Sequence, residues 1–151
     1  MRIGYYPGCS LKSSAREYDE SVRAVFEALD LELVEIPDWN CCGASSAHVM
    51  SADLALGLRA RNLAQAEAAG LKEVLTPCAA CFSHLAEAHI ELAHNPKKRQ
   101  EVADLIGLPY SGQIGVLNVL AVLDRYRDRI AEKVKNPFRY KVACYYGCLL
   151  V

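Results

Sequence analysis

The sequence predicts an α/β fold, a small three-layer domain in which helices flank a parallel sheet on both faces. Short apolar segments alternate along the chain with longer segments of helical periodicity, in the order strand–helix–strand–helix–strand–helix. Neighbouring parallel strands require crossover connections, which the intervening helices would supply. The length of 151 residues fits one domain that buries its own core.

The first half of the chain contains two strand patterns and two helix patterns. Residues 2–6 (RIGYY) are mostly apolar and aromatic, and residues 31–36 (LELVEI) alternate apolar and acidic side chains, as half-buried strands do. Apolar residues recur at helical spacing over 13–29. Strong helix formers fill 51–69, and Gly70 follows where a helix would end.

The second half continues this alternation. Residues 72–77 (KEVLTP) are the third predicted strand, and helices are predicted over 79–94 and 97–106. A loop (SGQIG) then precedes one further predicted helix, which is marked by Val116, Leu120, Leu123 and Ile130. Residues 138–144 (FRYKVAC) again resemble a strand.

Composition and charge argue against several classes of protein. The net charge is −1 and the basic residues are scattered, so the KKR at 97–99 fits a solvated helix start better than a nucleic-acid-binding patch. No apolar run approaches the roughly 20 residues that a membrane helix needs. The first residues lack the apolar core of a signal peptide, so we expect a cytoplasmic protein that is not exported.

Cysteine is the most informative residue type. In a chain that is not exported, the seven cysteines should be thiols, and clustered thiols indicate metal or redox chemistry. Five of them follow the three predicted strands: Cys9 the first, Cys41 and Cys42 the second, and Cys78 and Cys81 the third. Parallel strands all end at one edge of a sheet, where open α/β folds bind ligands, so these five side chains should converge.

Five converging thiols leave several interpretations open. Structural zinc takes four thiolates, which would leave one cysteine unexplained. A regular iron–sulfur cube also takes four, whereas a cluster with unequal iron sites could use a fifth. The adjacent Cys41 and Cys42 would suit neighbouring irons, because a disulfide between them would be strained, and Gly43 would let the backbone approach the sulfides. Each cysteine could also be a small buried side chain.

The end of the chain repeats its beginning. Residues 141–150 (KVACYYGCLL) align with residues 2–11 (RIGYYPGCSL), and Cys148 falls at the position of Cys9. A ten-residue match that includes a cysteine suggests that a second copy of the same unit begins here.

This repeat suggests a division of the chain. We expect a first cysteine-rich unit over 1–137, followed over 138–151 by the first strand and first cysteine of a second, truncated unit. Cys144 matches no cysteine of the first copy, and we expect it to be a buried strand residue.

The cysteine motifs resemble the CCG cysteine-rich domain, with PGCS at the first cysteine, WNCCGA at the pair and PCAACF at the last pair. The resemblance covers essentially the whole chain and is strongest to the N-terminal half of the B subunit of heterodisulfide reductase, in which two such domains follow each other. It implies a noncubane [4Fe–4S] cluster in each complete domain. The implied ligands of the first cluster are Cys9, Cys41, Cys42, Cys78 and Cys81. Cys148 would begin a second, incomplete site.

The resemblance also implies an enzymatic role. A protein of this kind would reduce the disulfide of coenzyme M and coenzyme B, or a related disulfide, by one-electron steps at a cluster whose five cysteine ligands are thereby catalytic. The implied partners are the disulfide, a ferredoxin-like iron–sulfur subunit and a flavin subunit, without nucleic acid or a membrane span. This chain alone should not turn over.

Two other functions stay open. CCG domains also resemble parts of quinone-linked enzymes that act on 2-hydroxy acids, glycerol-3-phosphate or succinate, where the cluster would relay electrons towards quinone. No ferredoxin-type CxxCxxC stretch precedes the first cysteine, which favours the disulfide function. The third possibility is a structural zinc module, and a domain handled in air can hold neither metal.

A few polar residues near the cysteines are weaker candidates. His84 lies within one helical turn of Cys81, and His48 follows the CCGASS stretch, so either could assist the ligands. An ordinary surface or half-buried histidine is the simpler interpretation of each. Trp39 could screen the site or belong to the core, and no catalytic role is assigned to these residues.

Overall fold

The computed structural model describes residues 2–44, 47–145, 147 and 149–150. Its centre is a parallel sheet of four strands in the order β2-β1-β3-β4. The strands are β1 (Arg2–Tyr5), β2 (Glu32–Glu35), β3 (Glu73–Leu75) and β4 (Gly115–Leu117). The predicted α/β class with a parallel sheet is confirmed.

Strand β1 lies inside the sheet and pairs with a neighbour on each side. Gly4 pairs with Val34 of β2 and with Val74 of β3. The bonding continues just past the strand, where the Tyr6 amide donates to the carbonyl of Leu75 over 2.9 Å. The chain therefore leaves β1 and β3 side by side at the same edge of the sheet.

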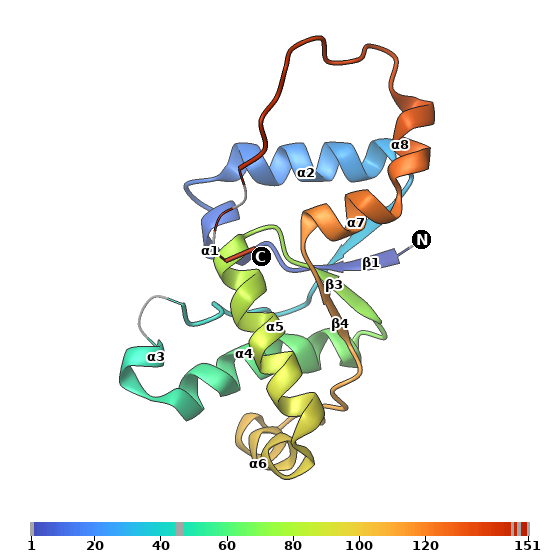
Figure 1. Cartoon of the computed structure of the whole chain (residues 1–151). Helices are drawn as coiled ribbons and strands as arrows, with labels where there is room; N and C mark the ends of the chain where they lie inside the picture. The colour runs from blue at the N-terminus through green and yellow to red at the C-terminus, as the bar shows by residue number, and fades with distance from the viewer. Residues whose placement is uncertain (1, 45–46, 146, 148, 151) are drawn as a thin grey trace.

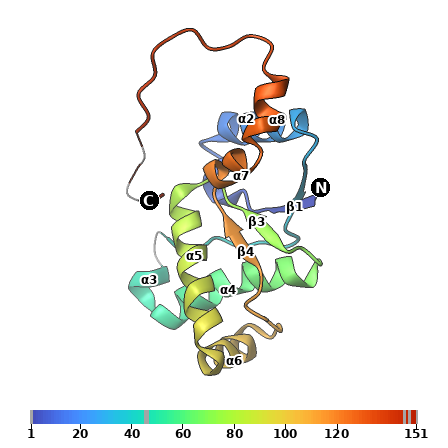
Figure 2. The same ribbon diagram turned by 45° about the vertical axis from the view of Figure 1, so that its right-hand side comes forward.

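Helices connect the strands and cover both faces of the sheet. They are α1 (Gly8–Leu11), α2 (Arg16–Ala28), α3 (Ala47–Met50), α4 (Ala52–Ala68), α5 (Ala79–His94), α6 (Pro96–Ile106), α7 (Val119–Arg125) and α8 (Arg127–Lys133). In Figures 1 and 2, α4, α5 and α6 lie on one side of the sheet and α2, α7 and α8 on the other. This is the predicted three-layer arrangement.

Each face of the sheet buries its own apolar core. Val74 of β3 packs in a cluster with Leu63 of α4 and Leu85 of α5. On the opposite face, Ile3 of β1 packs in a cluster with Phe26 of α2. Full burial of a side chain of this size contributes about 1.5–3 kcal/mol, so the two cores fix the sheet and the loops at its edge.

Local capping explains where two of the longer helices begin. At the start of α4, the Ser51 hydroxyl accepts a hydrogen bond from the Leu54 amide over 3.3 Å. At the start of α6, Asn95 accepts one from the Lys98 amide over 3.0 Å. Both satisfy amides that have no partner within the helix. The helices predicted over 13–29, 51–69, 79–94 and 97–106 are confirmed with small shifts at their ends.

Strand β4 is not predicted by the sequence patterns, and the helix expected around it is wrong in its first part. Val116, assigned to that helix, lies in β4 and pairs with Val74 of β3. Two short helices follow instead of one, and they meet at Tyr126. A strand of three residues is too short to show an alternating pattern, so only its pairing with β3 defines it.

The strand expected over 138–144 is not formed. Residues 138–145 are exposed and have no regular secondary structure. In Figures 1 and 2 the chain arches outward after α8 and returns towards α1 and the start of α5. None of the described strands pairs with this segment, and a strand needs such a neighbour. Cys144 is accordingly exposed, not buried as expected. The division of the chain at 138 stays a prediction.

Candidate metal centre at the carboxyl edge of the sheet

Five cysteines lie in the segments that follow β1, β2 and β3. Cys9 is in α1, directly after β1, and Cys41 and Cys42 are in the loop that follows β2. Cys78 precedes α5, and Cys81 lies in the first turn of that helix, after β3. Because the strands are parallel, all three segments leave from the carboxyl edge of the sheet.

The thiols meet in two groups. The Sγ of Cys42 lies 3.3 Å from the Sγ of Cys81, although the two residues are 39 positions apart in the sequence. Cys81 also shares a hydrogen bond with Cys78, and Cys41 shares one with Cys9. The peptide bond between Cys41 and Cys42 joins the two groups. The structure therefore brings all five thiols together, and their binding of a metal stays a prediction.

The site has a buried side and an open side. Cys42 and Cys81 are 1% and 4% exposed, and Cys78 is half-buried. Cys9 and Cys41 are exposed to solvent. A group held by these thiols would therefore lie against the core on one side and be accessible to a partner or substrate on the other.

Two glycines shape the backbone next to the thiols. Gly8 and Gly43 have φ angles of 70° and 78°, a region that residues with side chains rarely adopt. A Cβ at Gly8 would lie 3.1 Å from the Sγ of Cys81, so Gly8 keeps space open beside that thiol. A Cβ at Gly43 would lie 3.0 Å from the Cβ of Ala47. Gly43 therefore makes room for α3, where room for sulfide was expected.

Tyr6 forms the floor of the site, a role not expected from the sequence. Its side chain is fully buried, its hydroxyl donates to the carbonyl of Asn40 over 2.8 Å, and its ring meets that of Trp39 edge-on at 5.6 Å. Burial, followed by the negative charge of nearby thiolates with Cys81 foremost, raises the pKa of Tyr6 far above its ordinary value. Tyr6 therefore stays neutral, and it could have been suspected from the YYPGC stretch.

A hydrogen-bond network holds the loop that carries Cys41 and Cys42. Asn62 of α4 is fully buried; its Nδ2 donates to the carbonyl of Asn40 over 3.0 Å, and its Oδ1 accepts from the Asn40 amide over 2.9 Å. Asn40 in turn donates to the carbonyl of Cys41 over 2.8 Å and accepts from Arg61 over 2.9 Å. Buried amides need such partners, so an asparagine within an Ala- and Leu-rich helix was an available signal.

Hydrogen bonds between the thiols determine which of them ionise. Cys81 donates to Cys42 and Cys78, and these bonds lower the pKa of both acceptors below the ordinary value for a thiol. Burial opposes the effect on both acceptors but is outweighed. The same two bonds raise the pKa of Cys81. Because thiolate is the form that binds metal, Cys42 and Cys78 are prepared as ligands.

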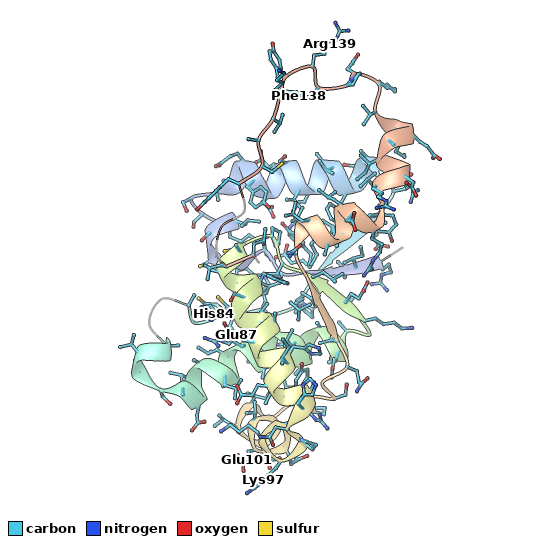
Figure 3. The ribbon with its side chains drawn as sticks, viewed as in Figure 1. His84, Glu87, Lys97, Glu101, Phe138 and Arg139 are labelled. Carbon is cyan, nitrogen blue, oxygen red and sulfur yellow. The ribbon has the colours of Figure 1, made fainter. Side chains whose placement is uncertain are left out.

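Positive side chains border the buried thiols. The charge of Arg59 on α4 contributes to the lowered pKa of Cys42, and that of His84 on α5 contributes at Cys78. Both side chains approach Glu87: the Arg59 Nη1 lies 3.4 Å and the His84 Nδ1 3.5 Å from its Oε2. Figure 3 shows His84 and Glu87 about one turn apart on α5.

An apolar groove of about 660 Å³ adjoins the site at Cys78. It lies between α1, the start of α5, α7 and the returning segment 142–145, which includes Cys144. Its apolar walls include Leu11, Ala15, Tyr18, Pro77, Val119 and Leu120. Burial and then the charge of Cys78 raise the pKa of Tyr18, so its phenol lies near that thiol.

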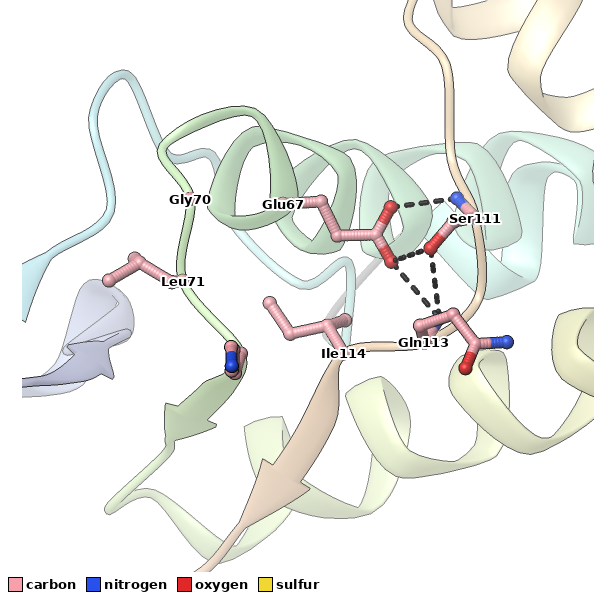
Figure 4. Close-up of a pocket in the computed structure, with 7 residues that line it drawn as sticks. Glu67, Gly70, Leu71, Ser111, Gln113 and Ile114 are labelled. Carbon is pink, nitrogen blue, oxygen red and sulfur yellow. Dashed lines mark hydrogen bonds between the residues drawn. The ribbon is translucent and has the colours of Figure 1, made fainter.

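A second pocket, of about 560 Å³, lies at the opposite edge of the sheet, before β3 and β4 (Figure 4). The carboxylate of Glu67 faces it and accepts hydrogen bonds from the Ser111 amide (2.7 Å), the Ser111 hydroxyl (2.9 Å) and the Gln113 amide (3.1 Å). Glu67 thus anchors the loop that leads into β4. This pocket therefore has a structural explanation that does not involve a ligand.

Some predicted residues cannot be placed in the site. Cys148 lies outside the described residues, and so does the side chain of His48. Cys144 lines the groove beside Cys78, but no described thiol is in contact with it. Within the described part of the chain, no three His, Cys, Asp or Glu side chains are arranged to hold a single metal ion. The five thiols meet in pairs instead.

A parallel sheet with five thiols at its carboxyl edge defines a thiol-rich α/β domain. The cysteine-rich domain family CCG matches residues 3–86, a span that includes all five of these cysteines. The chain therefore belongs to the CCG cysteine-rich domain family, as its cysteine motifs predict.

Curated relatives align along nearly the whole chain. A Wolinella succinogenes protein named 8-methylmenaquinol:fumarate reductase membrane anchor subunit is 38% identical, over 97% of this chain and 52% of its own length. An Archaeoglobus profundus protein, named as like the B subunit of heterodisulfide reductase, is 30% identical, over 93% and 47%. The B subunit of a Methanosarcina acetivorans ferredoxin/F420H2-dependent CoB-CoM heterodisulfide reductase is 29% identical, over 99% and 52%. The predicted similarity to this heterodisulfide reductase component is confirmed, and the chain spans about half the length of these relatives.

One solved structure supports the fold. The crystal structure of a hypothetical protein from Helicobacter pylori matches 82% of this chain and 25% of that chain, with a TM-score of 0.67 and 17% identity. A likeness at this identity shows the fold alone. Among the helices that the structure describes, none has both the length and the apolar character needed to cross a membrane.

Proposed function

We propose that this chain is an iron–sulfur electron-transfer unit of a multi-subunit oxidoreductase. Cys9, Cys41, Cys42, Cys78 and Cys81 would hold a noncubane [4Fe–4S] cluster. The observation that carries the proposal is the meeting of thiols from three separate loops, with Cys42 and Cys81 in contact at 3.3 Å. Membership of the CCG family and the reductase subunits among the relatives support it.

The thiols suit such a cluster better than a single zinc ion. Structural zinc needs four donors around one point, whereas the described thiols meet in pairs and no three of them share a point. Thiolates are the ligands of iron–sulfur clusters, and several irons spread over a wider space can accept paired sulfurs. Gly8 keeps room beside Cys81 that a side chain would fill.

The residues around the thiols would bind and shield the cluster. When bound, such a cluster supplies one-electron transfer. Tyr6 closes the floor and excludes water from below, and the buried Asn62 fixes the loop of the cysteine pair. The exposed Cys9 and Cys41 hold the side from which electrons enter or leave.

For the finer role we propose a quinol-linked reductase, which was the alternative expected from the sequence. The relative named for 8-methylmenaquinol is 38% identical, against 30% and 29% for the two heterodisulfide-type relatives. The apolar groove beside Cys78 supports the same choice, because a quinone ring is apolar and would lie next to a cluster ligand there. The Tyr18 phenol could donate a hydrogen bond to a quinone oxygen in this groove.

A disulfide reductase is the second candidate. A disulfide must bring one sulfur to the metal, and the open side at Cys9 and Cys41 would admit it. Relatives named as heterodisulfide reductase subunits support this candidate. The substrate would be the coenzyme M–coenzyme B heterodisulfide or a related one.

We also propose that residues 138–151 begin a second CCG unit, with Cys148 as its first ligand. The ten-residue repeat supports this division, and so does the length of the relatives, of which this chain spans about half. The partners would be further subunits of a reductase, such as a ferredoxin-like or a flavin subunit. A cytoplasmic location stays a prediction.

Metal analysis after anaerobic reconstitution tests the cluster. We expect about four iron and four sulfide per chain, with an EPR signal after oxidation that differs from that of a regular cube. One zinc per chain without sulfide would contradict the cluster and indicate the structural zinc module. Protein handled in air is the control, because oxidation of the thiols should remove the cluster.

Reoxidation of the reduced, cluster-loaded chain distinguishes the two finer roles. We expect a soluble naphthoquinone to reoxidise the chain with saturable kinetics, and Leu120→Glu, in the groove, to slow this at least about tenfold by burying a charge there. Leu105→Glu, on exposed α6 away from the groove, should react like the unmodified chain. Saturable reoxidation by an alkyl disulfide, with none by the quinone, would favour the disulfide reductase.

A further inference from the structure

Arg59 has a buried donor without a partner beside the thiol site. Its side chain is 12% exposed, and its Nη1 pairs with the Glu87 carboxylate at 3.4 Å. The Nε–H is buried as well, and no protein group accepts a hydrogen bond from it. A buried charged donor left unsatisfied is unfavourable. A group bound nearby would supply the missing acceptor.

The fold places this arginine next to the cysteine pair. Arg59 follows Leu58 on α4, and the Leu58 Cδ1 would lie 3.5 Å from a Cβ at Gly43, the residue after Cys42. This turn of α4 therefore packs on the loop that carries the pair. The influence of the Arg59 charge on the pKa of Cys42 agrees with that placement.

We propose that Arg59 is a positioning residue of the thiol site, whose Nε–H donates to a sulfur of the bound cluster and whose charge stabilises the cluster's reduced state. The inference rests on the proposed cluster and adds the residue that tunes its reduction potential. Five thiolates already make the site negative, and reduction adds one more negative charge. A fixed cation at a largely buried position lowers the energy of that state, because solvent screens it little.

Glu87 gives the proposal a second, opposite test. Its carboxylate lies within 4 Å of both Arg59 and His84 and partly neutralises them, and it is 61% exposed. Replacing Glu87 by glutamine keeps the size of the side chain and removes its charge. The Arg59 charge then acts on the cluster without compensation, so the reduction potential should rise. A residue with only a structural role would not produce opposite shifts in these two variants.

The experiment is an EPR-monitored redox titration of the cluster-loaded chain. At a fixed potential, we expect Arg59→Gln to lower the ratio of reduced to oxidised cluster about tenfold, which is 59 mV for a one-electron couple. Arg59→Lys keeps the charge without the Nε–H and should shift the ratio less, whereas Glu87→Gln should raise it. Arg139→Gln removes a positive charge at the outer bend of the C-terminal segment, far from the site, and should change nothing (Figure 3).

Two results would overturn the proposal: an unchanged potential in Arg59→Gln, or a lowered or unchanged potential in Glu87→Gln. If Arg59→Gln does not retain its cluster, Glu87→Gln decides alone, and a raised potential supports the proposal. Iron and sulfide contents are measured in every sample. A chain with the unmodified sequence that holds neither would contradict the proposed function itself and this inference with it.

Discussion

Replacing Cys81 with alanine is expected to leave the chain without iron and acid-labile sulfide, against about four of each per unmodified chain. Cys81 joins the buried thiols, because its Sγ lies 3.3 Å from that of Cys42 and it shares a hydrogen bond with Cys78. Gly8 keeps the space beside it open. Without Cys81, no thiol of α5 is in direct contact with the cysteine pair. Iron and sulfide analysis after anaerobic reconstitution measures the effect.

Cys144→Ala is the matched control, since it makes the same chemical change at an exposed thiol outside the two groups. We expect this variant to bind as much iron and sulfide as the unmodified chain. Circular dichroism of both variants separates loss of ligand from loss of fold. A folded Cys81→Ala chain with its full content of iron and sulfide would contradict the assignment of Cys81 as a ligand.

The fold class and the meeting of the cysteines could be predicted because each combines a local pattern with one topological rule. The alternation in LELVEI and the apolar KEVLTP segment mark β2 and β3 without any knowledge of their neighbours. Parallel strands then place the ends of β1, β2 and β3 at one edge. The contact between Cys42 and Cys81 follows from that rule, although their separation in the sequence gives no hint of it.

Elements that depend on tertiary partners could not be predicted in the same way. Strand β4 has three residues, and its Val116 fits an apolar helical pattern equally well until its pairing with Val74 is known. The segment 138–144 shows the converse. Its residues favour a strand, but no described strand lies beside it to complete the hydrogen bonds.

The groups around the thiols were missed because their roles come from burial and not from sequence spacing. Tyr6 was expected only as part of a strand, yet its hydroxyl holds the carbonyl of Asn40 beneath the thiols. Asn62 and Arg59 look like ordinary polar positions of an Ala-rich helix. Their burial against the cysteine loop becomes visible only when α4 is placed on the sheet.

Gly4→Ala is expected to lower the free energy of unfolding by about 3 kcal/mol, because the new methyl group has no space inside the sheet. Gly4 lies in β1 between β2 and β3, and a Cβ there would be 2.7 Å from the carbonyl oxygen of Glu73. That oxygen belongs to the backbone of β3, so it cannot move away as a side chain would. The two strands must separate, and Cys9 follows one of them while Cys78 and Cys81 follow the other. Urea denaturation measures the loss of stability, and iron analysis should show weaker cluster retention.

Gly115→Ala provides the control, because it adds the same methyl group to β4 next to the same residue. A Cβ at Gly115 would lie 3.4 Å from the Cγ of the Glu73 side chain, an ordinary contact that this side chain can relieve by a small movement. Alanine also restricts the unfolded chain more than glycine does, so this variant should be as stable as the unmodified chain or more stable by up to about 1 kcal/mol. Equal stabilities of the two variants would show that β1 and β3 can separate at no cost. The loops of Cys9 and Cys81 would then not be fixed by the sheet, and the site would lack the rigid frame that brings its thiols together.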